Sequence, residues 1–127
     1  MKELKILLVD DEEEFVSTLA ERLQFRNIPT LMATTGDDAL RLAESERPSV
    51  VVLDVMMPGM GGLEVLQRLK KRYPDIQIIL LTGRSSTKDG IQGMRLGAFD
   101  YLMKPIKIEE LIDKMNEALA ASEQGSQ

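Results

Sequence analysis

Residues 50–54 read VVVLD, four consecutive apolar residues followed by an aspartate. The same kind of run occurs at 6–10, which read ILLVD, and at 78–82, which read IILLT. A run that is apolar at every position is typical of a central strand in a parallel sheet, because helices cover both faces of such a sheet. We therefore expect these three runs to form central strands of a buried parallel sheet.

The rest of the chain alternates short strand candidates with longer helical patterns. Strands are expected at residues 4–9, 30–33, 50–53, 76–81 and 100–103. Helices are expected at 36–46, 62–73 and 86–96, with two more along the apolar stripes Phe15, Leu19, Leu23 and Ile108, Leu111, Ile112, Met115, Leu119. Five strand–helix repeats with short loops predict an α/β fold. It is a doubly wound, five-stranded parallel sheet of order 2-1-3-4-5, flavodoxin-like, in three αβα layers.

Length and composition describe one ordinary globular domain. The chain has 127 residues, of which 43% are hydrophobic and 29% charged. We expect the domain to occupy residues 1–120 and a flexible tail to occupy 121–127. The longest apolar runs have four residues, too few to span a bilayer, and the first residues lack the apolar core of a secretory signal. We therefore expect a cytoplasmic protein without membrane contact.

Two missing residue types and the net charge restrict the chemistry. The chain contains neither cysteine nor histidine. Disulfides, thiolate metal sites and hydrolase triads that need histidine are therefore excluded, and any chemistry must use carboxylates, lysine, hydroxyls and backbone groups. The net charge of -5 argues against direct binding of a nucleic-acid backbone by this domain.

Polar residues follow four of the five expected strands. Asp10 and Asp11 follow the first, Asp54 the third, Thr82 the fourth and Lys104 the fifth. Because the carboxyl ends of parallel strands lie at one edge of the sheet, we expect these five residues to converge beside its switch point. An acidic helix start is the ordinary reading of the run that begins at Asp10, and we keep that reading only for residues 12–14.

Three carboxylates at close range repel one another, and a divalent cation relieves the repulsion. Magnesium takes about six oxygen ligands, usually one or two carboxylates, water and phosphate. Asp11 and Asp54 can supply one oxygen each, the backbone carbonyl of Met56 another, and Asp10 can bind through water. The sequence therefore predicts a Mg²⁺ site.

The same residues suit phosphoryl transfer to an aspartate. An ionised Asp54 is already nucleophilic and needs no base. The Lys104 ammonium and the Thr82 hydroxyl can neutralise charge on the phosphoryl oxygens, and Lys104 can pair with Asp54 when no phosphoryl group is bound.

At these residues the chain resembles the receiver domain of two-component response regulators, including the single-domain, chemotaxis-regulator-like ones. The motifs are Asp10-Asp11, Asp54, Thr82-Gly83 and Lys104-Pro105, in that order. The flanking words are KILLVDD at 5–11, DVMMPGMGG at 54–62 and GAFDYLMKP at 97–105. The likeness covers about residues 4–120. It fits both a freestanding receiver and the N-terminal domain of a longer regulator.

The resemblance implies a signalling domain that catalyses only its own phosphorylation and dephosphorylation. A phosphohistidine on a sensor histidine kinase or on a phosphotransfer protein is the implied donor, and the Lys104-Pro105 bond is implied to be cis. Thr82 and Tyr101 are the implied switch residues. They alter the surface of helix 86–96, strand 100–103 and the last helix, which contacts a downstream effector protein or domain. We hypothesise a homodimer through this surface on phosphorylation.

Gly90 and Gly93 weaken helix 86–96 by about 1 kcal/mol each relative to alanine, which suits a segment with two states. Met56 and Arg84, each two residues beyond Asp54 or Thr82, are expected to alter the lifetime of the acyl phosphate, in a direction that the sequence does not give.

The competing function is a phosphatase with an aspartate nucleophile, of the haloacid dehalogenase type. That class carries its nucleophile in an Asp-x-Asp motif on the first strand, whereas Asp54 is followed by Val55 and Met56 on the third. A calcium-binding EF-hand is excluded, because residues 10–14 lack the alternating ligands and central glycine of its loop.

Overall fold

Five parallel strands form one sheet in the computed structural model, which describes residues 3–83 and 87–125. The strands are β1 (Ile6–Val9), β2 (Thr30–Ala33), β3 (Val50–Asp54), β4 (Gln77–Thr82) and β5 (Asp100–Met103). Their order is β2-β1-β3-β4-β5, and every neighbouring pair is parallel. The predicted fold class and strand order are therefore confirmed.

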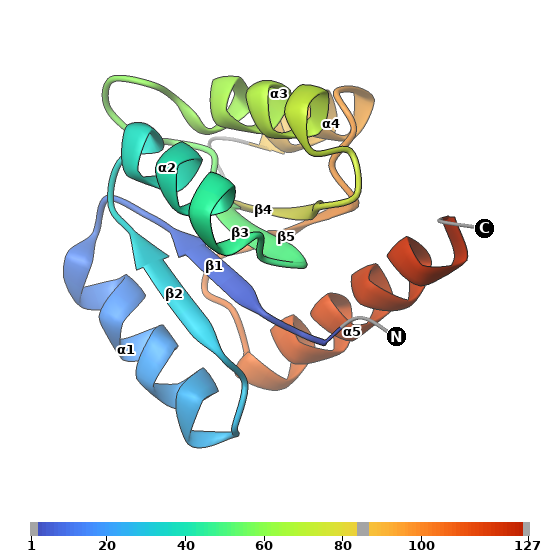
Figure 1. Cartoon of the computed structure of the whole chain (residues 1–127). Coiled ribbons are helices and arrows are strands. Elements are labelled where there is room, and N and C mark those ends of the chain that lie inside the picture. The colour runs from blue at the N-terminus through green and yellow to red at the C-terminus, as the bar shows by residue number, and fades with distance from the viewer. Residues whose placement is uncertain (1–2, 84–86, 126–127) are drawn as a thin grey trace.

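Helices cover both faces of the sheet. They are α1 (Glu13–Phe25), α2 (Gly36–Glu46), α3 (Gly62–Arg72), α4 (Thr87–Arg95) and α5 (Ile108–Gly125). Figure 1 shows α1 and α5 on one face and α2, α3 and α4 on the other, which gives the three expected layers. Among the described residues, no helix combines the length and the apolar character needed to cross a membrane.

Two apolar cores lie on the two faces because successive strand residues point in opposite directions. In β1, Leu7 and Val9 pack with α2 and α3, whereas Ile6 and Leu8 pack with α1 and α5. All four residues are at most 2% exposed. The runs are apolar at every position because both faces of the sheet are buried, as expected, and each residue of the run belongs to one core or the other.

Local signals set the helix ends. The Thr35 side chain accepts a hydrogen bond from the backbone N–H of Asp38 at 3.1 Å, so it caps the start of α2. The same helix ends at Arg47, which has a left-handed backbone and precedes Pro48. These signals leave short loops on both sides of α2, while the parallel pairing places the carboxyl ends of the strands side by side.

The last helix extends beyond the boundary expected at residue 120. α5 continues to Gly125, and Ser122 is buried. Its hydroxyl donates a hydrogen bond of 3.1 Å to the carbonyl oxygen of Asp75, just before β4. The helix thus includes residues 121–125, which were expected to belong to the tail. Residues 126 and 127 lie outside the described residues.

The two glycines of α4 lie against the sheet. Gly90 and Gly93 are both buried, and a Cβ atom at Gly93 would overlap the Leu80 side chain. Their absent side chains therefore allow α4 to approach β4 closely, in addition to lowering its intrinsic helix stability. The helix begins at Thr87 among the described residues, and Ser86, where it was expected to begin, lies outside them.

Candidate functional site

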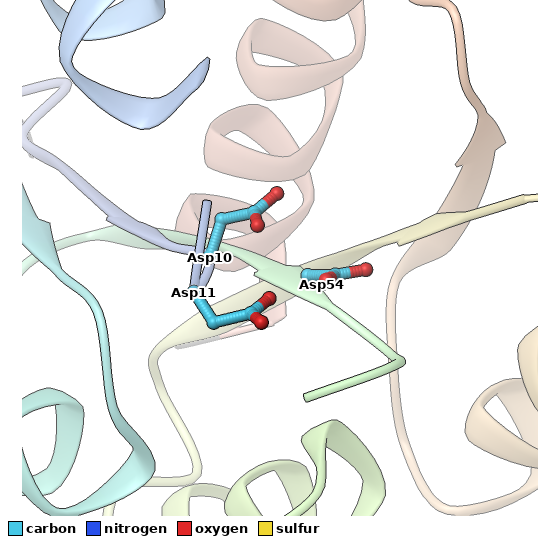
Figure 2. A group of neighbouring side chains, drawn as sticks. All are labelled: Asp10, Asp11 and Asp54. Atoms are coloured by element: carbon cyan, nitrogen blue, oxygen red, sulfur yellow. The ribbon is translucent and has the colours of Figure 1, made fainter. Parts of the chain in front are cut away.

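The carboxyl ends of the strands bring the predicted polar residues to one edge. Asp10 and Asp11 follow β1, Asp54 ends β3 and Thr82 ends β4, next to β5. Figure 2 shows the three aspartate side chains lying next to one another at the ends of β1 and β3. Lys104, immediately after β5, reaches the same point, because its ammonium lies 2.9 Å from the Asp10 carboxylate. The structure therefore brings together residues 94 positions apart in the chain.

The acidic trio has the composition of a cation site. One carboxylate oxygen from each of Asp10, Asp11 and Asp54 lies within 4.8 Å of the other two. Asp10 and Asp54 are 2% and 6% exposed, while Asp11 is open to solvent. Two buried carboxylates and one exposed carboxylate fit a hard divalent cation such as Mg²⁺, which keeps several water ligands on its open side.

The environment of Asp54 makes its ionisation harder than that of an ordinary aspartate. The pKa of the Asp54 carboxyl is raised from 3.8 to about 6, mainly by burial and then by the neighbouring charge of Asp10. The Lys104 ammonium and the backbone N–H of Met56 act in the opposite direction. A cation bound near the trio would therefore lower the pKa of Asp54 and stabilise its ionised, nucleophilic form.

Lys104 lies closest to Asp10. Its Nζ atom donates to Asp10 Oδ2 at 2.9 Å and lies 3.8 Å from Asp54 Oδ1 and 3.6 Å from Glu12 Oε1. Burial alone lowers the pKa of Lys104, but the hydrogen bond to Asp10 and the nearby carboxylates outweigh burial and raise it. The expected pairing with Asp54 is therefore secondary to the pairing with Asp10.

Thr82 ends β4, the strand beside β3, and Tyr101 lies on β5, the next strand. Thr82 is fully buried, and its hydroxyl has no hydrogen-bond partner among the described residues. A buried hydroxyl without a partner costs about 1–3 kcal/mol, so it is available to donate to an anion that arrives. Tyr101 pairs with Leu80, two residues before Thr82 on β4, and is half-buried on the edge strand β5.

The loop after β3 holds the remaining expected ligand. The backbone N–H of Met56, whose carbonyl was the expected ligand, donates to Asp54 Oδ1 at 3.4 Å. The Met56 side chain is 62% exposed to solvent. Arg84, expected to affect the same region from the other side, lies outside the described residues.

Two contacts of Lys104 were not expected from the sequence. Phe15, expected only as a core residue of the first helix, places the centre of its ring 4.7 Å from Lys104 Nζ. Glu12, expected only as a solvated residue of the helix start, lies within ion-pair distance of the same ammonium. The expected cis peptide bond at Lys104-Pro105 is present.

Known proteins share both the sequence and the shape of this chain. The family model of the response regulator receiver domain matches residues 6–116. The response regulator MprA of Mycolicibacterium vanbaalenii is 41% identical over 91% of this chain and 50% of its own length. The transcriptional regulatory protein YkoG of Bacillus subtilis is 40% identical over 94% of this chain and 52% of its own. The chain thus spans about half the length of these relatives.

Solved structures agree over nearly the whole chain. The receiver domain of the Francisella response regulator 1452 is 32% identical, with a TM-score of 0.84 over 93% of this chain and 98% of that one. A receiver domain protein from Clostridium thermocellum is 30% identical, with a TM-score of 0.90 over 94% and 97%. Together with the strand order and the acidic edge, these matches show that the chain belongs to the family of response regulator receiver domains of two-component systems.

Proposed function

We propose that this receiver domain accepts a phosphoryl group on Asp54, with Mg²⁺ bound beside it, and thereby switches a surface that contacts a downstream partner. The observation that carries the proposal is the convergence, at one edge of the sheet, of a buried carboxylate, an ammonium and a buried hydroxyl that has no partner among the described residues. These three groups are an acceptor and two stabilisers of the charge on a phosphoryl group.

The reaction transfers the phosphoryl group from nitrogen to oxygen. A carboxylate oxygen of Asp54 attacks the phosphorus of a phosphohistidine, the P–N bond breaks, and the nitrogen keeps its electron pair and takes a proton. The donor histidine belongs to a sensor histidine kinase or a phosphotransfer protein, since this chain has none. Lys104 neutralises charge on the phosphoryl oxygens, and the Thr82 hydroxyl donates to one of them.

The acidic trio is suited to hold the metal ion. Asp11, Asp54 and the backbone carbonyl of Met56 would supply ligands, and Asp10 would bind through water while it keeps its bond to Lys104. When bound, Mg²⁺ neutralises charge between the carboxylate and the incoming phosphoryl group. Water hydrolyses the resulting acyl phosphate, and the exposed Met56 side chain stands where it affects that access.

The switch surface is formed by α4, β5 and α5. It carries the half-exposed apolar side chains Ile91, Met94 and Met103, which suit contact with an effector protein or domain. Movement of Thr82 toward the phosphoryl group, followed by the Tyr101 ring, would alter this surface. A homodimer is a further proposed use of it, although Lys114 already pairs with Asp100 at 2.8 Å within the chain.

Other proposed properties follow from the same reading. We expect the protein to act in the cytoplasm, without direct contact to nucleic acid or membrane. The dehalogenase-type phosphatase is not favoured, because the family match covers residues 6–116 and the second aspartate of its motif is missing after Asp54. A receiver should show essentially no turnover of a generic ester such as p-nitrophenyl phosphate.

Intact mass spectrometry tests the acceptor. The protein is incubated with acetyl phosphate and Mg²⁺, in parallel with Asp54→Ala and with the control Asp113→Ala, which changes an exposed aspartate of α5. We expect one added phosphoryl group in wild type and control, none in Asp54→Ala, and none with EDTA. Absence of labelling in wild type, under conditions that label another receiver domain, would reject the proposal.

A second pair of variants tests the Thr82 hydroxyl. Thr82→Val removes a buried hydroxyl that has no partner among the described residues, so the unmodified protein should be as stable as wild type or about 1 kcal/mol more stable. Labelling by acetyl phosphate should nevertheless become about tenfold slower or more, because a donor to the phosphoryl oxygens is lost. Thr82→Ser keeps the hydroxyl and should label faster than Thr82→Val; equal rates would remove the hydroxyl from the mechanism.

A further inference from the structure

Gly90 and Gly93 both lie against the sheet in α4, but they face different neighbours. A Cβ atom at Gly93 would overlap Leu80, an aliphatic side chain of the core. A Cβ atom at Gly90 would lie 3.0 Å from Tyr101 Cδ2 and 3.1 Å from Thr82 Cγ2. The missing side chain of Gly90 therefore faces both Thr82 and Tyr101, the two residues to which the proposed function assigns the switch.

We propose that Gly90 is a positioning residue of the switch. Because Gly90 has no side chain, space is left between α4 and the sheet, beside the Thr82 methyl group and the Tyr101 ring. This volume allows the ring to move inward when the Thr82 hydroxyl turns toward phosphorylated Asp54. The inference rests on the proposed function and adds to it the residue that couples Thr82 to Tyr101.

The packing indicates which neighbour yields if the volume is filled. Thr82 is fully buried on β4, which pairs with strands on both sides. Tyr101 is half-buried on β5, an edge strand. Ordinary contacts between carbon atoms lie at about 3.5–4.0 Å, so a methyl group at position 90 is too close to both neighbours. Tyr101 therefore has more freedom to shift than Thr82, so we expect the ring to move outward while Thr82 gives by no more than a few tenths of an ångström.

Gly90→Ala therefore separates the two halves of the switch. Asp54 and Lys104 are not among the nearest neighbours of the added methyl group, and Thr82 keeps its hydroxyl, so we expect the variant still to accept a phosphoryl group. The Tyr101 ring, however, no longer has room beside Thr82 and stays outward in both the unmodified and the phosphorylated protein. Gly90 thus acts through Tyr101 and takes no part in the transfer itself.

Tyrosine fluorescence provides a direct measurement, because the chain has two tyrosines and no tryptophan. Tyr73→Phe leaves Tyr101 as the sole fluorophore, and the Tyr73 hydroxyl has no hydrogen-bond partner within the described residues. Acrylamide quenching is then measured before and after labelling with acetyl phosphate and Mg²⁺. Gly90→Ala is compared with Gly61→Ala, where an added Cβ has no atom within 4 Å.

We expect phosphorylation to reduce the quenching of Tyr101 in the parent and in Gly61→Ala. In Gly90→Ala the quenching should be higher before labelling, and its change on labelling should be lost while the mass gain persists. Unchanged quenching in Gly90→Ala, with the phosphorylation-dependent change intact, would overturn the inference. Failure of the parent to gain mass would instead reject the proposed function, and quenching of the unmodified proteins would still test the contact at Gly90.

A double-mutant cycle keeps the test informative if Gly90→Ala folds poorly. Alanine favours a helix over glycine, so any fall in the urea midpoint of Gly90→Ala comes from its tertiary contacts. If the Tyr101 ring is the contact, Gly90→Ala should lower the midpoint less in a Tyr101→Ala background than in the parent. An equal fall in both backgrounds would overturn the inference.

Discussion

At the scale of single residues, Asp54 is the group whose charge the site controls most strongly. It is buried beside the Asp10 carboxylate and lies 3.8 Å from the only ammonium that the described residues place near it. Ionisation of Asp54 makes it nucleophilic but adds a negative charge to a crowded acidic site. The pKa of about 6 reflects this conflict, and it gives the metal-free protein a measurable dependence on pH.

Asp54→Asn should stabilise the metal-free protein at pH 7 and leave its stability almost unchanged near pH 4. The pKa of Asp54 is higher in the folded protein than its usual 3.8, so the folded state holds the proton more tightly than the unfolded state. Wild type therefore loses stability, relative to the variant, as the pH rises from about 4 to about 6. The loss at pH 7 is on the order of 2–3 kcal/mol. Urea unfolding in EDTA at both pH values measures it. A difference that is the same at both values would contradict the assignment.

The position of the site was predictable from the sequence, but its internal pairing was not. Asp10, Asp54 and Thr82 each end an apolar run, and parallel strands bring such ends together. The sequence does not show which carboxylate lies closest to Lys104, since that depends on a side-chain position 94 residues away. The contact of Phe15 with the same ammonium depends on the packing angle of α1 and was likewise hidden.

At the scale of elements, the distance between α4 and the sheet is set where its two glycines pack against the strands. Gly93 lies against Leu80, which is fully buried, and Gly90 lies against the half-buried Tyr101. One glycine thus fixes the distance between helix and sheet, and the other adjoins a side chain that has room to move. The sequence shows only the low helix propensity of both glycines, because the contacts belong to strands that are distant in the chain.

Gly93→Ala should therefore destabilise the protein although alanine favours helices. The new methyl group overlaps Leu80 Cδ1 in a filled core, and overpacking of this kind costs about 1–3 kcal/mol. Gly61→Ala is the matched control, because that position has open space and an ordinary extended backbone. Urea unfolding of both variants measures the effect. Equal stability of Gly93→Ala and wild type would show that α4 withdraws from β4 at little cost.

The sequence predicted which helices and strands exist, and their order, better than it predicted where they end. The runs in β1, β3 and β4 were recognised because both of their faces are buried. The end of α5 was missed, because its residues 121–125 are small or polar and offer no apolar stripe. What holds that end is a hydrogen bond from Ser122 to the backbone at Asp75, and a pattern of hydrophobicity does not reveal such a contact.

At the scale of the whole molecule, binding of a divalent cation should stabilise the folded state. The acidic trio exists only in the folded sheet, because Asp10 and Asp54 come from different strands. Mg²⁺ should therefore stabilise the protein by about 2.7 kcal/mol at a concentration 100 times its dissociation constant. Thermal unfolding with and without Mg²⁺ measures the shift, which Asp11→Asn should reduce and Asp113→Asn should retain. An equal shift in both variants would place the ion elsewhere.

The acidic trio lies at the carboxyl ends of the strands, and the opposite end of the sheet is formed by their amino ends. β1 and β4 start at that far edge, and α5 returns to it, as the bond from Ser122 to Asp75 shows (Figure 1). The six residues of β4 span about 20 Å between the two edges. A reporter or affinity handle fused after α5 is therefore held a full strand length from Asp54, so the protein can be immobilised or tracked there while Asp54 stays open to its donor.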